Sequence, residues 1–345
     1  MNLVDRLLDD HFDDLGLDRL GLGRGLRSAL VTPGFATSRH VVAMVFEPGA
    51  AAPCLVVKLP RRAGDNAGVE TEGHMLRRLT GDARARVPGV PRFVGLLNHH
   101  GHSLLIEEAV RGAALDAAAV RRDPQGAVEA GVSFTASLPG TGVTAPGDRW
   151  YERSVEAPLR RLSAFRPFGD ETSRLLARTH DVLAPLRESA VPTVVEHGDL
   201  SHPNILRSRD GVLQVIDWER SDPLGILGHD LVFYLQYVHE SLRSAYTPAA
   251  QLEAFDHAFV GPHAPAGGLL RAHLAQRGVD PGLLPQVLVA TWARAAATLP
   301  SRLVPDTTSS VAGAHDAPEA VRAAIAADRD VLLWRHALGR FDALC

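Results

Sequence analysis

Three side chains between residues 199 and 217 are spaced in a way that suits the transfer of a phosphoryl group. Asp199 and Asn204 lie in the run HGDLSHPN at residues 197–204, and Asp217 follows thirteen residues later, at the end of an apolar run. Phosphoryl transfer needs an oriented hydroxyl nucleophile, metal ions on the phosphates and a cation beside them. A loop can place Asp199 at the hydroxyl and Asn204 at the metal, and a following hairpin can return Asp217 to that metal.

The cation that would hold the phosphates is the only lysine of the chain, Lys58, which stands among 35 arginines. An arginine bias has replaced lysine everywhere else. Lysine and arginine are nearly exchangeable on a surface, but not where a compact ammonium must approach phosphates from a crowded strand. Lys58 lies near the end of the Val- and Leu-rich run 54–59, and it is therefore a candidate phosphate ligand.

The elements that must position Lys58 are five short apolar runs and one helix in the first third of the chain. Val, Ile, Leu and Phe dominate the runs, and turn residues separate them, which is typical of strands. The runs are residues 26–32, 40–46, 54–59, 93–98 and 103–107, and the helical pattern covers residues 69–79. We expect a small antiparallel sheet domain, preceded by an amphipathic helix at about residues 2–15.

After Ala109 the sequence becomes rich in Ala, Leu and Arg, and helical patterns alternate with Pro and Gly. Two short apolar runs, 193–195 and 213–216, interrupt the helices, and the Gly-, Pro- and Thr-rich stretch 133–149 is predicted to be a loop or lid. The longest helical patterns cover about residues 114–129, 153–187, 229–242, 249–259, 283–297 and 318–338.

The pattern His-x-Asp-(x)4-Asn followed by Ile-Asp-Trp-Glu at 216–219 resembles the aminoglycoside phosphotransferase and choline kinase group, the small-molecule branch of the protein-kinase-like fold. Protein kinases have arginine where this chain has Gly198, and phenylalanine where it has Trp218. The resemblance runs from about Thr32 to Tyr234. It implies a bilobal α+β fold, with a nucleotide-binding lobe at residues 1–108 and a helical catalytic and substrate lobe at 109–345.

The resemblance also implies ATP as phosphate donor, with GTP possible, and Mg²⁺ held by Asn204 and Asp217. Asp199 would accept or orient the proton of the acceptor hydroxyl. His197, the second candidate in the catalytic loop, is expected to brace the loop more than to transfer protons. Asp230 is expected to cap a helix or brace the loop, with a substrate contact as the alternative. Glu219 stays open between a metal contact, a substrate contact and solvated surface.

On the N-terminal side, the resemblance implies that Lys58 pairs with a glutamate on the next helix. Glu72 matches the family's position, and Glu70 stays open because helix phase alone does not exclude it. The turn at residues 32–38 takes the place of the loop that covers the phosphates, and residues 105–109 match the hinge that binds the adenine ring. The cofactor-binding candidates in these two segments are Gly34, Thr37, Ser38, Glu107 and Ala109.

The composition of the chain bears on which binding partners and which cellular compartment to expect. The formal charge is −4 with a pI of about 6.5, and without a basic stripe nucleic acid is not expected as a partner. Two cysteines far apart, an acidic first stretch and no apolar run of 18 residues favour a cytoplasmic protein without membrane contact. Either a monomer or a homodimer is compatible with the sequence.

The acceptor is expected to be a small molecule with a hydroxyl group, such as an aminoglycoside or another antibiotic or natural product, with a role in antibiotic resistance. A metabolic kinase for a sugar, nucleoside, choline or homoserine is the alternative. A protein kinase is disfavoured because residues 225–234 run directly into a helix, without an Ala-Pro-Glu-like segment. A catalytically inactive nucleotide-binding protein would lack a ligand of the set, and none is missing.

Overall fold

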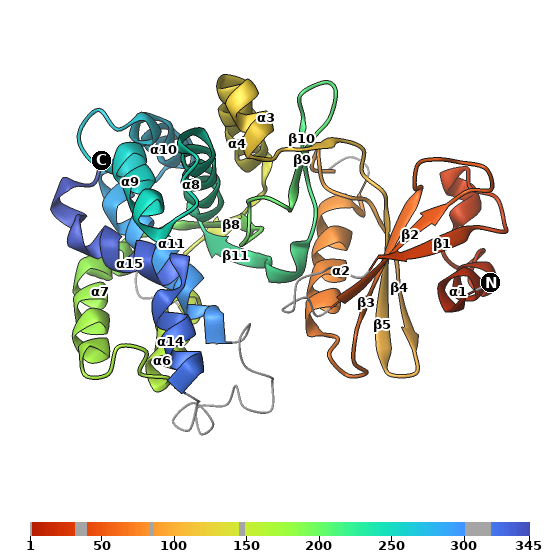
Figure 1. Cartoon of the computed structure of the whole chain (residues 1–345), viewed down its shortest axis with the longest axis horizontal. Coiled ribbons are helices and arrows are strands. Elements are labelled where there is room, and N and C mark those ends of the chain that lie inside the picture. Colours follow the sequence, from red (N-terminus) through yellow and green to blue (C-terminus); the bar gives the residue numbers. More distant parts are fainter. Residues whose placement is uncertain (1, 32–39, 83–85, 145–148, 301–318) are drawn as a thin grey trace. The chain divides into compact units, whose positions relative to one another are not determined.

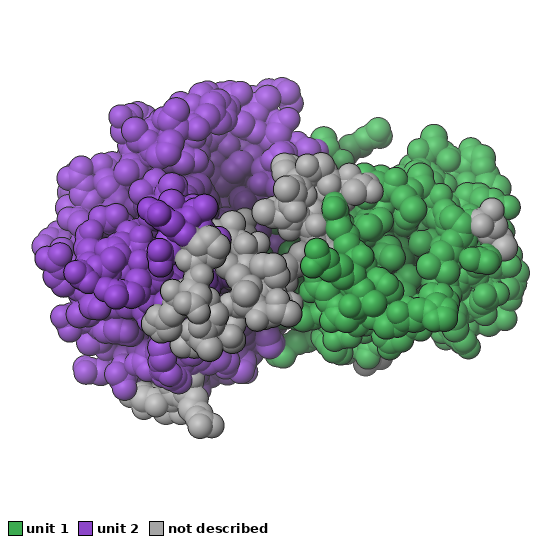
Figure 2. Space-filling model, turned by 60° about the horizontal axis from the view of Figure 1, so that its bottom comes forward, with its two compact units in different colours: residues 1–113, 204–221 green, residues 114–203, 222–345 purple. Residues whose placement is uncertain are grey.

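The computed structural model describes residues 2–31, 40–82, 86–144, 149–300 and 319–345. The chain forms two compact units, which Figure 2 shows in different colours. The first unit holds residues 1–113 together with 204–221, and the second holds residues 114–203 and 222–345. The sequence predicted a single boundary between residues 108 and 109. The observed division differs from that prediction mainly in the stretch 204–221, which belongs to the first unit. That stretch belongs to the first unit because its backbone bonds there: Val215 N–H donates to the Gly89 carbonyl at 2.8 Å.

The first unit contains the expected five-stranded antiparallel sheet, with strand order β1-β2-β3-β5-β4 (Figure 1). Val-rich, alternating sequences favour these strands, and the mixed α and β prediction of the fold is confirmed. The strands are β1 (Arg27–Val31), β2 (His40–Phe46), β3 (Leu55–Pro60), β4 (Phe93–His99) and β5 (His102–Glu108).

Helices cover the two faces of this sheet. Because side chains alternate along a strand, Val57 and Ile106 point to one face, where they pack with Leu8 of α1 (Leu3–Asp10). The opposite face carries Lys58, which lies across from Leu105 in the register of β3 and β5. On that face lies α2 (Ala67–Thr80), where a Cβ at Gly73 would already be 3.4 Å from the Leu105 side chain.

The first helix is shorter than the amphipathic pattern predicted. Asn2 caps α1: its side-chain oxygen accepts a hydrogen bond from Asp5 N–H, and the Asp5 carboxylate accepts one from the Asn2 backbone N–H. The helix ends at Asp10, and a 3₁₀ turn, η1 (Leu17–Leu20), follows at the left-handed Gly16.

The part of the first unit that comes later in the chain is a hairpin of β9 (Ile205–Arg207) and β10 (Leu213–Val215), followed by the 3₁₀ turn η3 (Trp218–Arg220). It packs closely on Gly89, where a Cβ would lie 2.0 Å from the Leu213 carbonyl oxygen and φ is +81°. Only glycine fits such an approach. The two-residue strand β6 (Ala113–Ala114) is where the chain passes from the first unit to the second.

The second unit is mostly helical, with one three-stranded sheet of order β11-β8-β7. Its strands are β7 (Gly140–Val143), β8 (Pro192–Glu196) and β11 (Asp222–Ile226). Its helices are α3 (Ala117–Arg122), α4 (Pro124–Ser137), α5 (Arg149–Tyr151), the π-helical η2 (Glu152–Glu156), α6 (Ala157–Ala164), α7 (Glu171–Glu188), α8 (His229–Arg243), α9 (Pro248–Phe259), α10 (Pro265–Gln276), α11 (Leu284–Ala297), α14 (Glu319–Ala327) and α15 (Arg329–Gly339), with 3₁₀ turns η4 (Pro281–Leu283) and η5 (Phe341–Ala343).

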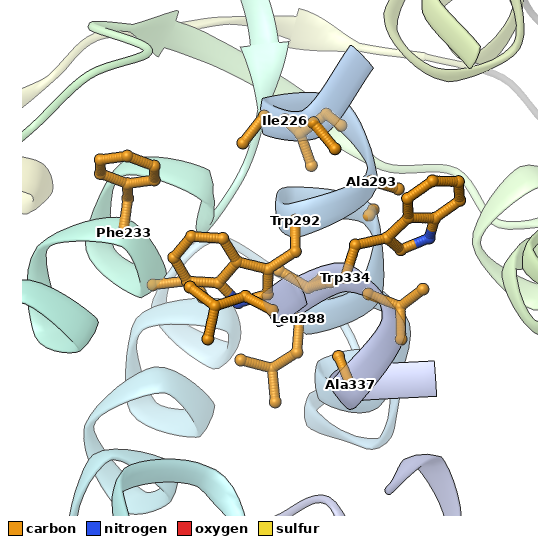
Figure 3. Packing of buried hydrophobic residues seen from close by; sticks show 14 of the residues in the cluster. Ile226, Phe233, Leu288, Trp292, Ala293, Trp334 and Ala337 are labelled. Carbon is orange, nitrogen blue, oxygen red and sulfur yellow. The ribbon is translucent and has the colours of Figure 1, made fainter. Parts of the chain in front are cut away.

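The core of the second unit is centred on α11 (Figure 3). Trp292 of α11 packs near Phe233 of α8, with ring centroids 5.4 Å apart, and Trp334 of α15 is buried in the same cluster. Burying each of these large side chains stabilises the fold by roughly 2–3 kcal/mol. The core therefore holds α8 and β11, the elements on either side of the turn that precedes Asp230.

Two expectations for this unit need correction. Of the stretch 133–149, predicted as a loop or lid, residues 133–137 belong to the end of α4 and residues 140–143 form β7, while residues 145–148 lie outside the described residues. Its small residues pair with β8, because Gly140 and Gly142 face Val194 and Thr193 in register. Helix α10 was not predicted, since its Gly- and Ala-rich sequence carries only a weak helical pattern.

Candidate active site

Lys58 on β3 forms a buried ion pair with Glu72 on α2. Its Nζ lies 2.5 Å from Glu72 Oε1, and the lysine is only 6% exposed. The alternative, Glu70, points elsewhere and accepts a hydrogen bond from Ser103 Oγ at 2.7 Å. The structure therefore brings Lys58 together with Glu72, the residue at the family position.

Two further carboxylates face the same ammonium. Glu107 Oε1 and Asp217 Oδ1 each lie 3.7 Å from Lys58 Nζ. We call Lys58, Glu72, Glu107 and Asp217 the lysine cluster. Burial alone would lower the pKa of Lys58, but Glu107, Glu72 and Asp217 outweigh it and raise that pKa. Lys58 is therefore held as a fixed positive charge.

The lysine cluster carries more carboxylates than cations. Burial raises the pKa of Glu107 to about 8, with Lys58 acting in the opposite direction. Within the described residues, the Oε2 atoms of Glu72 and Glu107 are buried without a hydrogen-bond partner. Three acidic groups beside one cation make a place that takes up an added positive charge, either as a proton on Glu107 or as a further cation.

Asp217 and Asn204 are placed side by side by the backbone of the hairpin. The Asn204 carbonyl accepts a hydrogen bond from Ile216 N–H at 2.9 Å, one residue before Asp217. Asp217 itself has φ +68°, and its side chain is 38% exposed. Such a conformation is uncommon outside glycine and concentrates at functional positions. The residues fit Mg²⁺, which takes a few protein oxygens and completes its shell with phosphate and water.

Among the described residues, no group of three His, Cys, Asp or Glu side chains is arranged to hold a metal ion by itself. The amide of Asn204 and the carboxylate of Asp217 therefore suit a metal that arrives with its phosphates.

The residue after Asp217 ties the hairpin to α2. Trp218 N–H donates to Glu72 Oε1 at 2.9 Å, and its indole N–H donates to the Val215 carbonyl at 3.0 Å. One oxygen of Glu72 thus orients Lys58 and fixes the peptide beside Asp217. Glu219, for which the sequence left a metal contact, a substrate contact and solvated surface open, has its Oε2 3.0 Å from His40 Nδ1.

The catalytic-loop candidates lie in the second unit, directly after β8. Asp230, near the start of α8, accepts hydrogen bonds from His197 N–H at 2.7 Å and Gly198 N–H at 2.9 Å. His197 is fully buried, and its Nδ1 accepts from Asp199 N–H at 3.2 Å. These contacts favour the bracing role expected for both His197 and Asp230. Burial, with Glu196 second, raises the pKa of Asp230 to about 7.

Three charged residues beneath this loop were not predicted. Arg294 of α11 donates to Glu196 Oε2 and, at 3.1 Å, to Asp222 Oδ2. We call Arg294, Glu196 and Asp222 the arginine cluster. Glu196 and Asp222 are partners in the β8–β11 register, and they lie where the chain leaves and rejoins the second unit. In the sequence, only the charged residue Glu196 at the end of the apolar run 193–195 pointed to this cluster.

The hinge candidates differ from expectation in detail. Glu107, expected in a hinge that binds adenine through its backbone, turns its side chain toward Lys58. The N–H groups of Glu108 and Ala109 donate to the carbonyls of Arg92 and Cys54 at 2.9 and 3.0 Å. The backbone N–H of Ala109 is thus engaged within the first unit, and the binding of the adenine ring by this segment stays a prediction. Gly34, Thr37 and Ser38 lie outside the described residues.

One unit has a five-stranded sheet with a lysine–glutamate pair, and the other is helical with a braced His-x-Asp loop, and this combination defines a protein-kinase-like fold. The model of the phosphotransferase enzyme family, APH, matches residues 45–263, and the chain belongs to this family.

Solved structures support the same fold. The GDP complex of wild-type aminoglycoside 2′-phosphotransferase-IIIa is 16% identical, with a TM-score of 0.53, and covers 96% of this chain and 99% of that one. A thermostable mutant of aminoglycoside phosphotransferase APH(4)-Ia, in ternary complex with ADP and hygromycin B, is 14% identical, with a TM-score of 0.52 and coverage of 94% and 98%. No sequence among the curated proteins matches. No described helix combines the length and apolar character needed to span a bilayer.

Proposed function

We propose that this protein is an ATP-dependent kinase that moves the γ-phosphate onto a hydroxyl group of a small molecule. The observation that carries the proposal is the lysine cluster, in which one buried ammonium is held beside three acidic side chains. Two of these, Glu72 and Glu107, keep a buried oxygen without a hydrogen-bond partner in the part of the chain that the structure describes. An aminoglycoside or another antibiotic- or natural-product-like compound is the proposed acceptor. A sugar, nucleoside, choline or homoserine is the alternative.

The residues of the first unit bind and orient the donor in this proposal. Lys58, oriented by Glu72, contacts the α- and β-phosphates, and Asn204 with Asp217 holds Mg²⁺. The metal, when bound, neutralises charge on the phosphates and on the transferred group. Because the cluster is buried and its geometry is fixed before binding, its charges act strongly and need little rearrangement.

The residues of the second unit act on the acceptor. Asp199 accepts or orients the proton of the attacking hydroxyl, and the His197 ring fixes the Asp199 backbone. Asp230 in turn holds the two peptides that precede Asp199. The acceptor oxygen forms a bond to the γ-phosphorus while the bond from that phosphorus to the β–γ bridging oxygen breaks, ADP leaves, and the hydroxyl proton passes to Asp199. Most of the rate enhancement then comes from position and charge.

The test is phosphate transfer from ATP with Mg²⁺ to a panel of aminoglycosides, nucleosides, amino sugars and choline, followed by mass spectrometry. We expect one class to be phosphorylated and Asp199→Asn to lower the rate by roughly 10²–10⁴-fold. Asp181→Asn, on the outer part of α7, is the matched control and keeps the rate. An Asp199→Asn variant with full activity would contradict the proposed role, and Mg²⁺-independent nucleotide binding without transfer would favour an inactive nucleotide-binding protein.

A further inference from the structure

The second unit contains a pocket of about 470 Å³ that the proposed mechanism does not yet use. Its walls come from the start of α3, the end of α8, the turn after it, α9 and the catalytic loop. The lining residues are Asp116, Ala117, Ala118, His202, Tyr237, Glu240, Ser241, Ala245, Tyr246 and Gln251. A pocket of this size lies in the range of small-molecule sites.

The pocket is linked to the chemistry through His202. This residue lies three positions after Asp199 in the same loop, so an acceptor that contacts His202 is within reach of the Asp199 segment. Every lining residue belongs to the second unit, and the site is therefore complete within one unit. On the proposed function, this is where the acceptor binds.

Of the two carboxylates of the pocket, Glu240 is paired with a cation, whereas Asp116 makes a helix-capping hydrogen bond that leaves it charged. Glu240 Oε1 accepts from Arg329 Nε at 2.9 Å and from Gln236 Nε2 at 2.8 Å. Asp116 caps α3, and its Oδ1 accepts from Ala119 N–H at 2.8 Å. A polycationic acceptor needs carboxylates that are not neutralised, because the attraction must repay the loss of its hydration.

A cation also borders the pocket. Arg121 Nη1 lies 3.3 Å from the Tyr246 hydroxyl and 2.9 Å from the Ser241 carbonyl, which it bonds. The hydrogen bond from Arg121 lowers the pKa of Tyr246. Besides burial, which raises the pKa of Tyr237, Asp116 and Arg121 act in opposite directions on that pKa, and Arg329 pairs with Glu240, so guanidinium groups offset the two carboxylates of this pocket.

The other polar side chains that line the pocket are uncharged groups. Tyr246 is 69% exposed, and Tyr237 borders the same space while its hydroxyl donates to the Leu115 carbonyl. Ser241, Gln251 and His202 add groups that donate and accept hydrogen bonds. Flat tyrosine rings give contact area at low entropic cost, and such polar groups select hydroxyls without requiring charge.

We propose that this pocket is the acceptor site and that it selects an uncharged, hydroxyl-bearing ring compound over a polycation. The inference rests on the proposed kinase function and narrows its acceptor. Aminoglycosides would then be poor acceptors, and a nucleoside, a cyclitol or a neutral antibiotic with hydroxyl groups would be better ones.

The experiment measures binding to the full chain without nucleotide, by ligand-observed NMR and calorimetry. The probes are uridine, myo-inositol and chloramphenicol as uncharged compounds, and hygromycin B and kanamycin as polycations, at low and high salt. We expect at least one uncharged probe to bind more tightly than both polycations, with an affinity that salt hardly changes.

Variants test the pocket itself. Tyr246→Ala should weaken the uncharged probe about tenfold, whereas Tyr246→Phe keeps the ring and should cost less than about threefold. Leu224→Ala, an exposed truncation outside the pocket, is the control for general damage. Gln251→Glu adds an unpaired carboxylate and should shift the preference toward hygromycin B.

The outcomes are distinguishable. Tighter, salt-sensitive binding of a polycation, binding of no uncharged probe, or binding that Tyr246→Ala leaves unchanged overturns the inference. If an uncharged probe binds through Tyr246 but is not phosphorylated with ATP and Mg²⁺, the site stands and the kinase function fails for that compound. If transfer occurs only to polycations, the kinase function stands and the inference fails.

Discussion

The two units each bury a cluster of charges beside the segment 197–221, and the clusters are built in opposite ways. In the lysine cluster, one ammonium faces three carboxylates, and Glu72 and Glu107 each keep a buried oxygen without a partner among the described residues. In the arginine cluster, one guanidinium bridges Glu196 and Asp222, and Glu196 Oε2 also accepts Ile226 N–H at 2.9 Å.

The difference separates a site that receives a ligand from one that holds the backbone. Arginine presents several donors in a rigid fork and satisfies two carboxylates at once, whereas lysine is a compact charge that leaves oxygens over. Unsatisfied buried charge costs stability, and proteins keep it where function needs it. The lysine cluster should therefore be sensitive in activity, and the arginine cluster in stability.

Among variants that compare the two clusters, Asp217→Asn in the lysine cluster is expected to have the largest effect on the transfer rate. Transfer should fall by about 10³-fold or more, because a metal carboxylate is lost from the place where charge develops. The free energy of unfolding should stay the same or rise, because one of three like charges around Lys58 is removed. Transfer assays and urea unfolding without metal check both parts, and a clear loss of stability would break the comparison.

The arginine cluster should respond in the opposite sense. Arg294→Met leaves Glu196 buried without its main cation, and we expect the free energy of unfolding to fall by about 3–5 kcal/mol. Arg335→Met, which removes an exposed pair with Glu171, is the control and should cost less than about 1 kcal/mol. Urea unfolding measures both variants. Equal losses would show that the cluster does not support the fold.

A smaller effect distinguishes the clusters by pH. The folded-state pKa of Glu107 is about 8, above its ordinary 4.5, so the folded protein binds the extra proton. Stability from this group is full below pH 4.5 and is lost as the pH rises toward 8. Glu107→Gln should remove most of this pH-dependent loss in unfolding curves recorded from pH 5 to 8.5. If the free energy of unfolding of Glu107→Gln depended on pH as that of the unchanged protein does, a buried protonated acid at Glu107 would be contradicted.

The smallest effect is expected at His40 and Glu219. Burial lowers the pKa of His40, but the bond to Glu219 outweighs it and leaves the pKa raised above 6.5. The pair therefore stabilises the fold below pH 6.5, and this contribution is lost as the pH rises past the raised value. Glu219→Gln should cost about 0.5 kcal/mol at pH 6 and little at pH 9. Equal losses at the two pH values would argue against a charged pair.

The elements that carry strong local patterns were predictable from the sequence. The five strands and α2 follow from alternating Val-rich runs and a helical spacing, and the lone Lys58 stood out against the arginine bias. Helix phase could not choose between Glu70 and Glu72. That choice depends on Ser103 of β5, whose hydroxyl donates a hydrogen bond to Glu70 Oε1.

The arginine cluster could not be predicted, because its members are brought together only by the tertiary fold. Glu196 and Arg294 are separated by 98 positions in the chain, and nothing local to either one points to the other. The side-chain direction of Glu107 was also missed, since it follows from the register in which Lys58 lies opposite Leu105. Such features depend on strand pairing, which sequence patterns fix weakly.

The hairpin at residues 204–221 has a consequence for how the protein is made. The first unit is discontinuous in the chain, so a ribosome that has finished residues 1–113 has not yet supplied Asn204, Asp217 or the peptide that bonds Glu72. Domains tend to fold as they are synthesised, from the N-terminus onward. Here the sheet with Lys58 and Glu72 can form early, but the first unit stays incomplete until residues 114–203 and then the segment 204–221 with Asp217 have been synthesised. Nucleotide-binding competence should therefore arise late in synthesis, well after the sheet itself has formed.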